Sequence, residues 1–145
     1  MLFHYFGEAL ASEMTPHKCR VVLVDDHEPM RKALRVLLAS FDDVELVGEA
    51  RDGEEAIQQV ASCQPDVILL DIRMPKMNGI EAANVIRKSW KDTVIIGLCL
   101  VDDTYTTEAF LKAGALAVIS KERLDDLHST IQRACVKRMS APGMQ

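Results

Sequence analysis

The sequence predicts an α/β protein in which helices cover both faces of a parallel sheet. Five short apolar runs alternate with five segments whose apolar residues recur at helical spacing. The runs are nearly continuous and rich in β-branched residues, which is typical of strands buried on both faces. Strict alternation of such strands with helices indicates the doubly wound α/β class. A chain of 145 residues is long enough to bury the core of one such domain without disulfides.

The first half of the chain contains three predicted strands, over residues 20–24, 44–50 and 67–70. After the first strand, Pro29 falls where the first turn of a helix favours proline. The apolar positions of this helix are Met30, Ala33, Leu34, Leu37 and Leu38. After the second strand, Asp52 is predicted to cap a helix, because Glu55 follows at the spacing of a capping box. The predicted apolar face of that helix consists of Ala56, Ile57, Val60 and Ala61, and Pro65 ends it.

The second half contains two more strands and three helices. The strands are predicted over residues 94–98 and 116–119. Asn78 is a predicted cap for a helix over residues 79–89, with apolar positions Ile80, Ala83, Val85 and Ile86. A weaker helix over residues 104–113 ends at Gly114, the residue type that most often follows a helix C-terminus. The last helix runs to about Met139, with apolar positions Leu124, Leu127, Ile131 and Ala134.

The composition argues against several classes of partner. A net charge of −5 and a pI near 5.3 disfavour a general binder of nucleic acids or of anionic membranes. No apolar run approaches the length of a membrane span, and the N-terminus lacks the basic and apolar regions of a signal peptide. The four cysteines show no C-x-x-C spacing, which favours buried thiols in a reducing compartment. We therefore expect a cytoplasmic protein.

We expect one domain over residues 19–139, preceded by an extension over residues 1–18 and followed by a frayed tail over residues 140–145. The extension carries apolar residues at helical spacing, Leu2, Phe3, Phe6 and Leu10. Three interpretations are open. The stripe is a contact for a partner or for a second copy of the chain, or it belongs to a tail without structure. Alternatively, translation starts at Met14 and the stripe is not part of the protein. We expect the extension to be flexible.

Polar residues follow four of the predicted strands. Asp25 and Asp26 come directly after the first strand, Asp71 after the third, Cys99 after the fourth and Lys121 close after the fifth. The carboxyl ends of parallel strands meet at one edge of the sheet, so we expect these side chains to converge. Three carboxylates at one edge repel one another unless a cation binds. Mg²⁺ suits such oxygen ligands, because it uses a few carboxylates and keeps waters that a phosphate can replace.

Asp71 is the candidate nucleophile of this site. A carboxylate can accept a phosphoryl group to form an acyl phosphate, and the transfer needs positive charge near the phosphoryl oxygens. Lys121 would supply part of that charge. Each feature alone has a simpler interpretation, since an acidic pair often forms a turn or a helix cap and a loop lysine is often only solvated. Their common position at strand ends favours a phosphoryl site.

The segment from Asp71 to Gly79, DIRMPKMNG, has an acidic pair upstream and a lysine downstream, and it resembles the receiver domain of bacterial two-component response regulators. The runs VVLVDDHEPMRKALRVLL and LDIRMPKMNGIEA most resemble the NarL/FixJ (LuxR-type) branch of that family. The resemblance extends over residues 20–139. It implies a flavodoxin-like (βα)₅ fold with the strand order 2-1-3-4-5. Met74-Pro75 and Gly79 correspond to the loop that shapes the family's pocket.

The resemblance also implies a role for each site residue. Asp71 corresponds to the phosphoacceptor, and Lys121 corresponds to the lysine that pairs with the phosphoryl group. Asp25 and Asp26 correspond to the acidic pair that holds Mg²⁺, together with Asp71 and the backbone carbonyl of Arg73. The implied phosphoryl donor is a sensor histidine kinase. The implied protein is a signalling module that catalyses only its own phosphorylation and dephosphorylation, and it is not a metabolic enzyme.

Two positions depart from the family pattern. Cys99 stands where the family carries threonine or serine, and Val118 stands where an aromatic residue is common, three residues before the lysine. A thiol is a weaker hydrogen-bond donor than a hydroxyl, so we expect weaker coupling between phosphorylation and the loop after Cys99. Cys99 also fits a small packed side chain without a functional role. The alternative hypothesis is therefore an atypical receiver that acts as an interaction or dimerisation module independently of phosphorylation.

The branch that the chain resembles usually adds a C-terminal DNA-binding domain, and only residues 140–145 follow the last predicted helix. Either the chain is a stand-alone receiver or it is the receiver portion of a longer regulator of transcription. In neither case do we expect this chain to bind nucleic acid directly. A phosphohydrolase is disfavoured, because such enzymes carry a second acid two residues after the nucleophile and Arg73 occupies that position.

Overall fold

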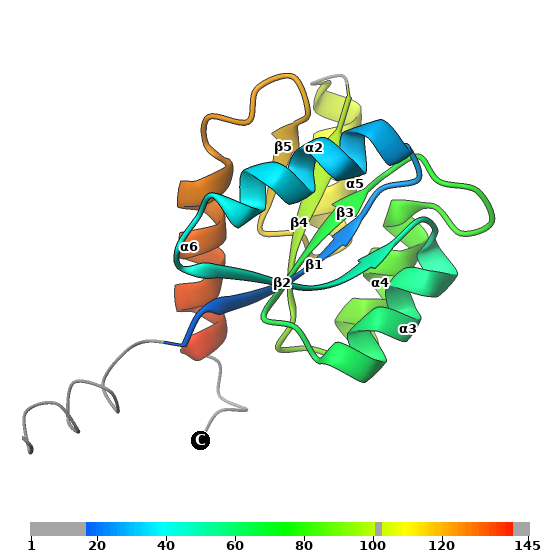
Figure 1. The fold of residues 1–145 in the computed structure, drawn as a ribbon. Coiled ribbons are helices and arrows are strands. Elements are labelled where there is room, and N and C mark those ends of the chain that lie inside the picture. Colours follow the sequence, from blue (N-terminus) through cyan, green and yellow to red (C-terminus); the bar gives the residue numbers. More distant parts are fainter. Residues whose placement is uncertain (1–16, 101–102, 141–145) are drawn as a thin grey trace, which may run out of the picture.

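The computed structural model describes residues 17–100 and 103–140 (Figure 1). The apolar stripe predicted at Leu2, Phe3, Phe6 and Leu10 and most of the predicted tail lie outside these residues. None of the described helices combines the length and the apolarity that crossing a bilayer would require. The described elements, in chain order, are β1 (Cys19–Val24), α2 (Glu28–Ala39), β2 (Val44–Ala50), α3 (Gly53–Cys63), β3 (Val67–Asp71), α4 (Gly79–Ser89), β4 (Val94–Cys99), α5 (Thr104–Lys112), β5 (Ala117–Ser120) and α6 (Leu127–Met139).

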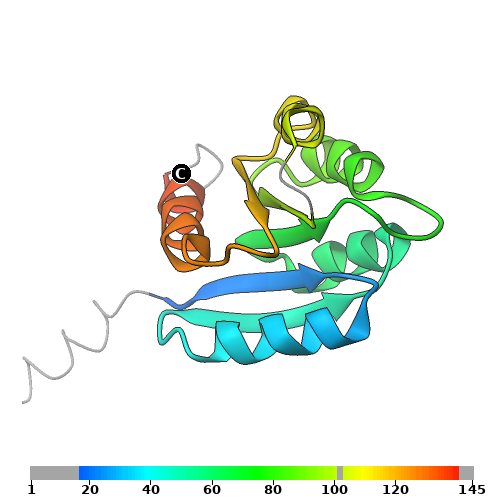
Figure 2. The same ribbon diagram turned by 90° about the horizontal axis from the view of Figure 1, so that it is seen from above.

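The five strands of the described region are parallel and lie in the order β2-β1-β3-β4-β5. This arrangement confirms the predicted flavodoxin-like fold and its strand order. Helices α2 and α6 cover one face of the sheet, and α3, α4 and α5 cover the other (Figures 1 and 2). The central strand β3 is buried along its whole length, because both of its faces are covered. Burial on both faces explains why its sequence is continuously apolar up to its last residue.

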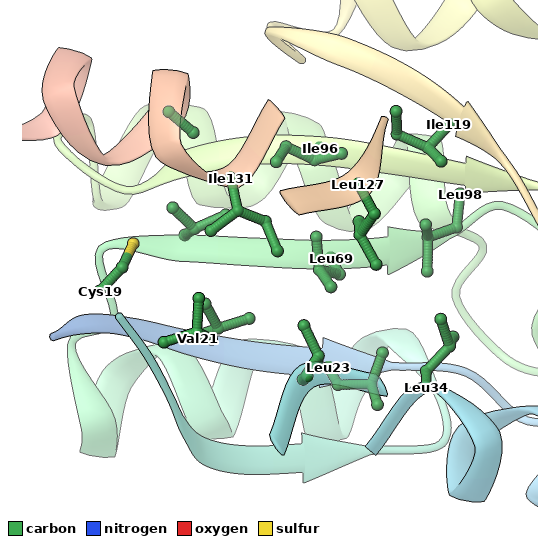
Figure 3. Close-up of a cluster of buried hydrophobic side chains, with 14 of the residues drawn as sticks. Cys19, Val21, Leu23, Leu34, Leu69, Ile96, Leu98, Ile119, Leu127 and Ile131 are labelled. Atoms are coloured by element: carbon green, nitrogen blue, oxygen red, sulfur yellow. The ribbon is translucent and has the colours of Figure 1, made fainter. Parts of the chain in front are cut away.

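Alternate side chains of each strand pack into two separate apolar layers. In β1, Val21 and Leu23 face α2 and α6, whereas Val22 and Val24 face α3, α4 and α5. Figure 3 shows the first of these layers, in which side chains of the sheet meet those of α2 and α6. With both faces occupied by helices, the carboxyl ends of the strands remain as the edge where polar residues collect.

The predicted helix boundaries follow from local hydrogen bonding. The side chains of Asp52 and Asn78 accept hydrogen bonds from backbone N–H groups three residues later, at 2.8 and 2.9 Å. Helix α5 ends in a Schellman motif, in which the N–H of Ala115 donates to the carbonyl of Phe110 at 2.9 Å. Gly114 has a φ of 105° in this motif, a conformation that favours glycine.

Three predictions about the helices are wrong in detail. Ala33 was expected among the apolar positions of α2 and is exposed, whereas Leu34 and Leu38 of the same helix are buried. Ala61 was expected on the buried face of α3 and is exposed, because it lies about 140° around the helix from Ala56. Cys63, at the end of that helix, packs partly against the core instead. Leu124 lies in the turn before α6, which begins at Leu127, although its side chain still packs against the core.

Candidate functional site

Asp25 and Asp71 lie side by side at the carboxyl ends of β1 and β3. The preceding residues, Val24 and Leu70, are partners in the parallel ladder, so the two aspartates fall at the same edge. Asp25 is 0% exposed and Asp71 is 4% exposed, whereas Asp26 is exposed to solvent. Ligand oxygens of the three carboxylates lie within 4.8 Å of one another. The structure thus brings together the three carboxylates that the strand-end argument places at this edge.

Lys121 reaches the same point from β5. Its Nζ lies 2.8 Å from Asp25 Oδ2 and 3.2 Å from Asp71 Oδ1, and its side chain is only 7% exposed. The backbone N–H of Lys121 donates to the carbonyl of Cys99 at 2.7 Å, which holds the lysine at the end of the β4–β5 ladder. Because β4 lies between β5 and β3, only a long side chain can bring a charge from β5 to Asp71.

Burial and charge shift the pKa values of the two central groups. Burial raises the pKa of Asp71 to about 6, while the Lys121 ammonium opposes the rise and the Asp25 carboxylate adds to it. Burial on its own lowers the pKa of Lys121, but the hydrogen bond to Asp25 and the charge of Asp71 outweigh it, so the net pKa is raised. Three carboxylates against one ammonium leave an excess of negative charge. These hard oxygen donors fit a Mg²⁺ ion, which would neutralise that excess.

Asp25 is held in place by its own backbone neighbours. The N–H of His27 donates to Asp25 Oδ1 at 2.9 Å, and Arg31 Nη1 donates to the carbonyl of Asp25 at 2.7 Å. The N–H of Asp25 donates in turn to the carbonyl of Ala50 at 3.0 Å. One carboxylate oxygen therefore remains directed toward Lys121, while the other fixes the rotamer.

A cavity of about 410 Å³ opens beside Asp71, and its wall includes Asp26, Arg73, Cys99 and Lys121. Cys99 ends β4, is 2% exposed, and its Sγ lies 3.8 Å from the carbonyl of Ile119. A buried thiol thus stands in the wall of the cavity, at the position for which the sequence predicts weakened coupling. The role of the Arg73 carbonyl as a metal ligand stays a prediction.

Asp103 also lines the cavity, although it is not among the site residues predicted from the sequence. Its carboxylate caps α5, accepting from the backbone N–H of Thr106 at 2.6 Å and from the hydroxyl of Thr106 at 3.0 Å. The hydrogen bond from that N–H is the main cause that lowers the pKa of Asp103, and Arg73 contributes through its charge. The spacing Asp-x-x-Thr at the start of a helical pattern is a recognisable cap signal. It would have placed Asp103 at the mouth of the site.

In the loop between β3 and α4, the backbone at Gly79 packs directly against the backbone of Asp71 and Ile72. The N–H of Gly79 donates to the carbonyl of Ile72 at 2.9 Å. A Cβ added at Gly79 would overlap the carbonyl oxygen of Asp71 and lie 2.8 Å from the Cα of Ile72. Glycine is therefore required sterically, directly beside the candidate nucleophile.

In a buffer with a chelator, the protein should lose stability as the pH rises from about 4 to about 7 because of Asp71. Its pKa is raised from the ordinary value of 3.8 to about 6, so in that window the folded state binds more protons than the unfolded state. The variant Asp71→Asn removes this cost and should be more stable than the wild type by about 3 kcal/mol at pH 7 and nearly equal at pH 4. Urea unfolding at both pH values measures the difference. A difference that does not change with pH would contradict the expectation.

Comparisons with known proteins agree with these features. Residues 21–132 match the response regulator receiver domain family. The chain is 44% identical over 111 residues to a protein-glutamate methylesterase/protein-glutamine glutaminase of Pyrococcus abyssi, a match that covers 74% of this chain and 30% of that protein. It is 36% identical over 110 residues to the transcriptional regulatory protein DegU of Brevibacillus brevis, covering 76% of this chain and 47% of that protein. The chain thus spans less than half the length of these curated relatives.

Two solved structures resemble the fold closely. One is the signal receiver domain of the response regulator NarL from Mycobacterium tuberculosis, with a TM-score of 0.76 and 31% identity over 82% of this chain and 98% of that chain. The other is the response regulator domain of CheB from Thermotoga maritima, with a TM-score of 0.78 and 32% identity over 83% of this chain and 98% of that chain. Nearly the whole of each of these domains is therefore matched by this chain.

Proposed function

Because this chain belongs to the response regulator receiver domain family, in its NarL/LuxR branch, we propose that it accepts a phosphoryl group from a sensor histidine kinase on Asp71. The observation that carries the proposal is the cluster in which the Lys121 ammonium lies 3.2 Å from Asp71 Oδ1, beside the carboxylates of Asp25 and Asp26. This cluster combines a nucleophile with the charges that phosphoryl transfer requires. As a signalling module of a two-component system, the phosphorylated domain would change its affinity for an output partner.

Asp71 is the group that would react. A carboxylate oxygen of Asp71 forms a bond to phosphorus, while the bond from phosphorus to the donor histidine nitrogen breaks and its electron pair stays on that nitrogen. Above a pH of about 6 the carboxylate is ionised, as a nucleophile must be. The adjacent cavity of about 410 Å³ offers room for the phosphoryl group.

Lys121 would neutralise the group that Asp71 accepts. Its raised pKa keeps the ammonium charged, and its contacts with Asp25 and Asp71 hold it beside the reacting oxygen. When Mg²⁺ is held by Asp25, Asp26, Asp71 and the backbone carbonyl of Arg73, it supplies further neutralisation of the phosphoryl oxygens. The domain would in this way catalyse its own phosphorylation and its own slow dephosphorylation.

Incubation with acetyl phosphate and Mg²⁺ tests the proposal without the cognate kinase. Intact-mass measurement should show one added phosphoryl group per chain, and a chelator should prevent its appearance. The adduct should be lost on treatment with hydroxylamine, which cleaves acyl phosphates and leaves phosphate esters intact. A chain that remains unmodified under these conditions would refute phosphoryl acceptance.

A second candidate function is a module whose interactions do not depend on phosphorylation. The observation that favours it is Cys99, a buried thiol in the cavity wall, together with Val118, a half-buried aliphatic residue where an aromatic one is common. In that case beryllofluoride with Mg²⁺ would bind at Asp71 but would change neither the amide NMR signals of residues 103–121 nor self-association. Self-association into a homodimer would then be the output.

The variant Cys99→Thr tests whether the missing hydroxyl weakens the response to a group on Asp71. A hydroxyl is a stronger donor than a thiol, so it should strengthen the link between a group on Asp71 and the segment that follows β4. We expect larger beryllofluoride-induced NMR shifts over residues 103–121 in the variant than in the wild type. Cys63→Ser, a substitution outside the site, is the matched control and should leave the shifts unchanged. Equal shifts in wild type and Cys99→Thr would assign Cys99 a packing role only.

The regulatory output that we propose for this domain rests on its similarity to transcriptional regulators. DegU is a transcriptional regulatory protein, and the chain spans 47% of its length. We propose that the unit over residues 19–139 acts in the cytoplasm and regulates transcription through a DNA-binding domain, either on a separate protein or further along a longer regulator. With a net charge of −5, the chain itself is unsuited to direct contact with nucleic acid.

A further inference from the structure

We propose that Cys19, Asp66 and Cys135 form a second metal site, for a thiophilic divalent cation such as Zn²⁺, at the end of the sheet opposite to Asp71. The two thiol sulfurs and a carboxylate oxygen of this cluster lie within 4.8 Å of one another. The cluster is separate from the phosphoryl site, because it lies where β1 and β3 begin and the aspartates lie where they end. The proposal does not depend on phosphoryl acceptance.

Three elements bring these residues together. Cys19 is the first residue of β1, Asp66 directly precedes β3, and Cys135 projects from α6, the helix that covers this face of the sheet. Cys19 lies at the edge of the apolar layer that includes Ile131 of α6 (Figure 3). The carboxylate of Asp66 is oriented by the backbone, since its Oδ2 accepts from the N–H of Arg20 at 2.9 Å. The Asp66 carboxylate is therefore held in place beside the two sulfurs.

The donor set selects a different class of metal from the site at Asp71. Two soft thiolates, together with one carboxylate, favour Zn²⁺, whereas a cluster of hard oxygen donors alone favours Mg²⁺. Zn²⁺ accepts three protein ligands with a water in the fourth position. Cys19 is buried, whereas Cys135 and Asp66 are half-buried. The fourth coordination position, with its water, would therefore lie on the side of Cys135 and Asp66, where solvent reaches the site.

Charge balance at this end of the sheet also suits a divalent cation. Without a metal the thiols are neutral, because burial and the neighbouring Cys135 thiol raise the pKa of Cys19 far above its ordinary range, and burial also raises the pKa of Cys135. A bound cation reverses that preference, since a coordinating thiol is deprotonated. The guanidinium of Arg138, with Nε 3.9 Å from Asp66 Oδ1, supplies one further positive charge. One Zn²⁺ with Arg138 would therefore balance two thiolates and the carboxylate.

Zn²⁺ bound here would join the beginning of the domain to its last helix. The start of β1 lies beside α6 (Figure 1), and Cys19 and Cys135 belong to these two elements. A ligand that binds only the folded state stabilises it by mass action. Zn²⁺ should therefore raise the melting temperature of the full chain.

The test is a titration of the full-length chain with Zn²⁺ and with Cd²⁺, in a phosphine reductant and excess Mg²⁺. We expect one Zn²⁺ per chain, an ultraviolet thiolate-to-metal absorption band with Cd²⁺, and a Zn²⁺-dependent rise in melting temperature. Cys135→Ser, a nearly isosteric change at a half-buried position, should remove the band. It should weaken Zn²⁺ binding by more than about 100-fold, the upper end of the loss caused by removing an outer-shell partner.

The other two cysteines provide matched controls. Cys63→Ser and Cys99→Ser should keep the band and the affinity, and retention in Cys99→Ser excludes binding in the cavity beside Asp71. Asp66→Asn still offers an oxygen to the N–H of Arg20, so it should fold and yet bind Zn²⁺ more weakly. Wild-type affinity in Cys135→Ser, or the absence of a thiolate band in the reduced wild type, would overturn the proposal. A Cys19–Cys135 disulfide formed in air by a chain that binds no Zn²⁺ after reduction would equally overturn it.

Discussion

Replacement of Asp71 by asparagine is expected to abolish phosphoryl acceptance while leaving the fold intact. The amide has the shape of the carboxylate but lacks the anionic oxygen that attacks phosphorus. Asp71 is 4% exposed and carries a carboxylate that burial disfavours, so the neutral amide should be tolerated by the buried strand end. With acetyl phosphate and Mg²⁺, we expect Asp71→Asn to show no added phosphoryl group by intact mass. Its circular dichroism spectrum should match that of the wild type.

Asp26→Asn is the matched control for this substitution. Asp26 belongs to the same carboxylate cluster, but it is exposed and is assigned only to the metal. The variant should need a higher Mg²⁺ concentration and should still reach one phosphoryl group per chain. If Asp71→Asn were phosphorylated like the wild type, the acceptor would be another residue. If Asp26→Asn failed at every Mg²⁺ concentration, the division between nucleophile and metal ligand would be wrong.

The convergence of Asp25, Asp71 and Lys121 could be predicted because it depends on topology alone. Continuous apolar runs indicate parallel strands covered on both faces, and the carboxyl ends of such strands share one edge. Each of these residues follows its predicted strand directly or after one residue. Their convergence could therefore be predicted without any detail of side-chain packing. The helix caps at Asp52 and Asn78 were predictable for a similar reason, since their hydrogen bonds connect residues three apart.

Features that depend on how a helix is rotated about its axis and shifted along the sheet could not be predicted in the same way. The cluster of Cys19, Asp66 and Cys135 requires that α6 present Cys135 to the beginning of β1. Sequence spacing does not determine how a helix is rotated and shifted along the sheet. Ala61 illustrates the same limit on a smaller scale, because one residue beyond the buried face of α3 is enough to expose it.

The sequence also could not predict which side chains from different strands form ion pairs. That Lys121 pairs with Asp25 at 2.8 Å as well as with Asp71 depends on the reach of its side chain across β4. The pairing has a consequence for the reaction. Because Asp25 also binds the ammonium, we expect Lys121 to stay beside Asp71 whether or not Asp71 is protonated.

Gly79→Ala is expected to destabilise the domain by about 3 kcal/mol, because the added methyl group meets backbone and not a movable side chain. Its Cβ would overlap the carbonyl oxygen of Asp71 and lie 2.8 Å from the Cα of Ile72. Either the start of α4 or the end of β3 must shift, and the hydrogen bond from Gly79 to Ile72 would be strained. The same shift moves Asp71, so phosphorylation by acetyl phosphate should slow as well. Urea unfolding and the rate of adduct formation measure the two effects.

Gly48→Ala is the matched substitution on β2, far from the site. There the added Cβ would meet the end of the Gln59 side chain, with the Cys63 sulfur 3.3 Å away, and Gln59 can change its rotamer. Alanine also loses less conformational entropy on folding than glycine, so the net change should be within about 1 kcal/mol. The adduct should form at the wild-type rate in this variant. Equal unfolding free energies for Gly79→Ala and Gly48→Ala would contradict this expectation. They would mean that the backbone of the loop before α4 shifts at little cost and does not hold Asp71 in place.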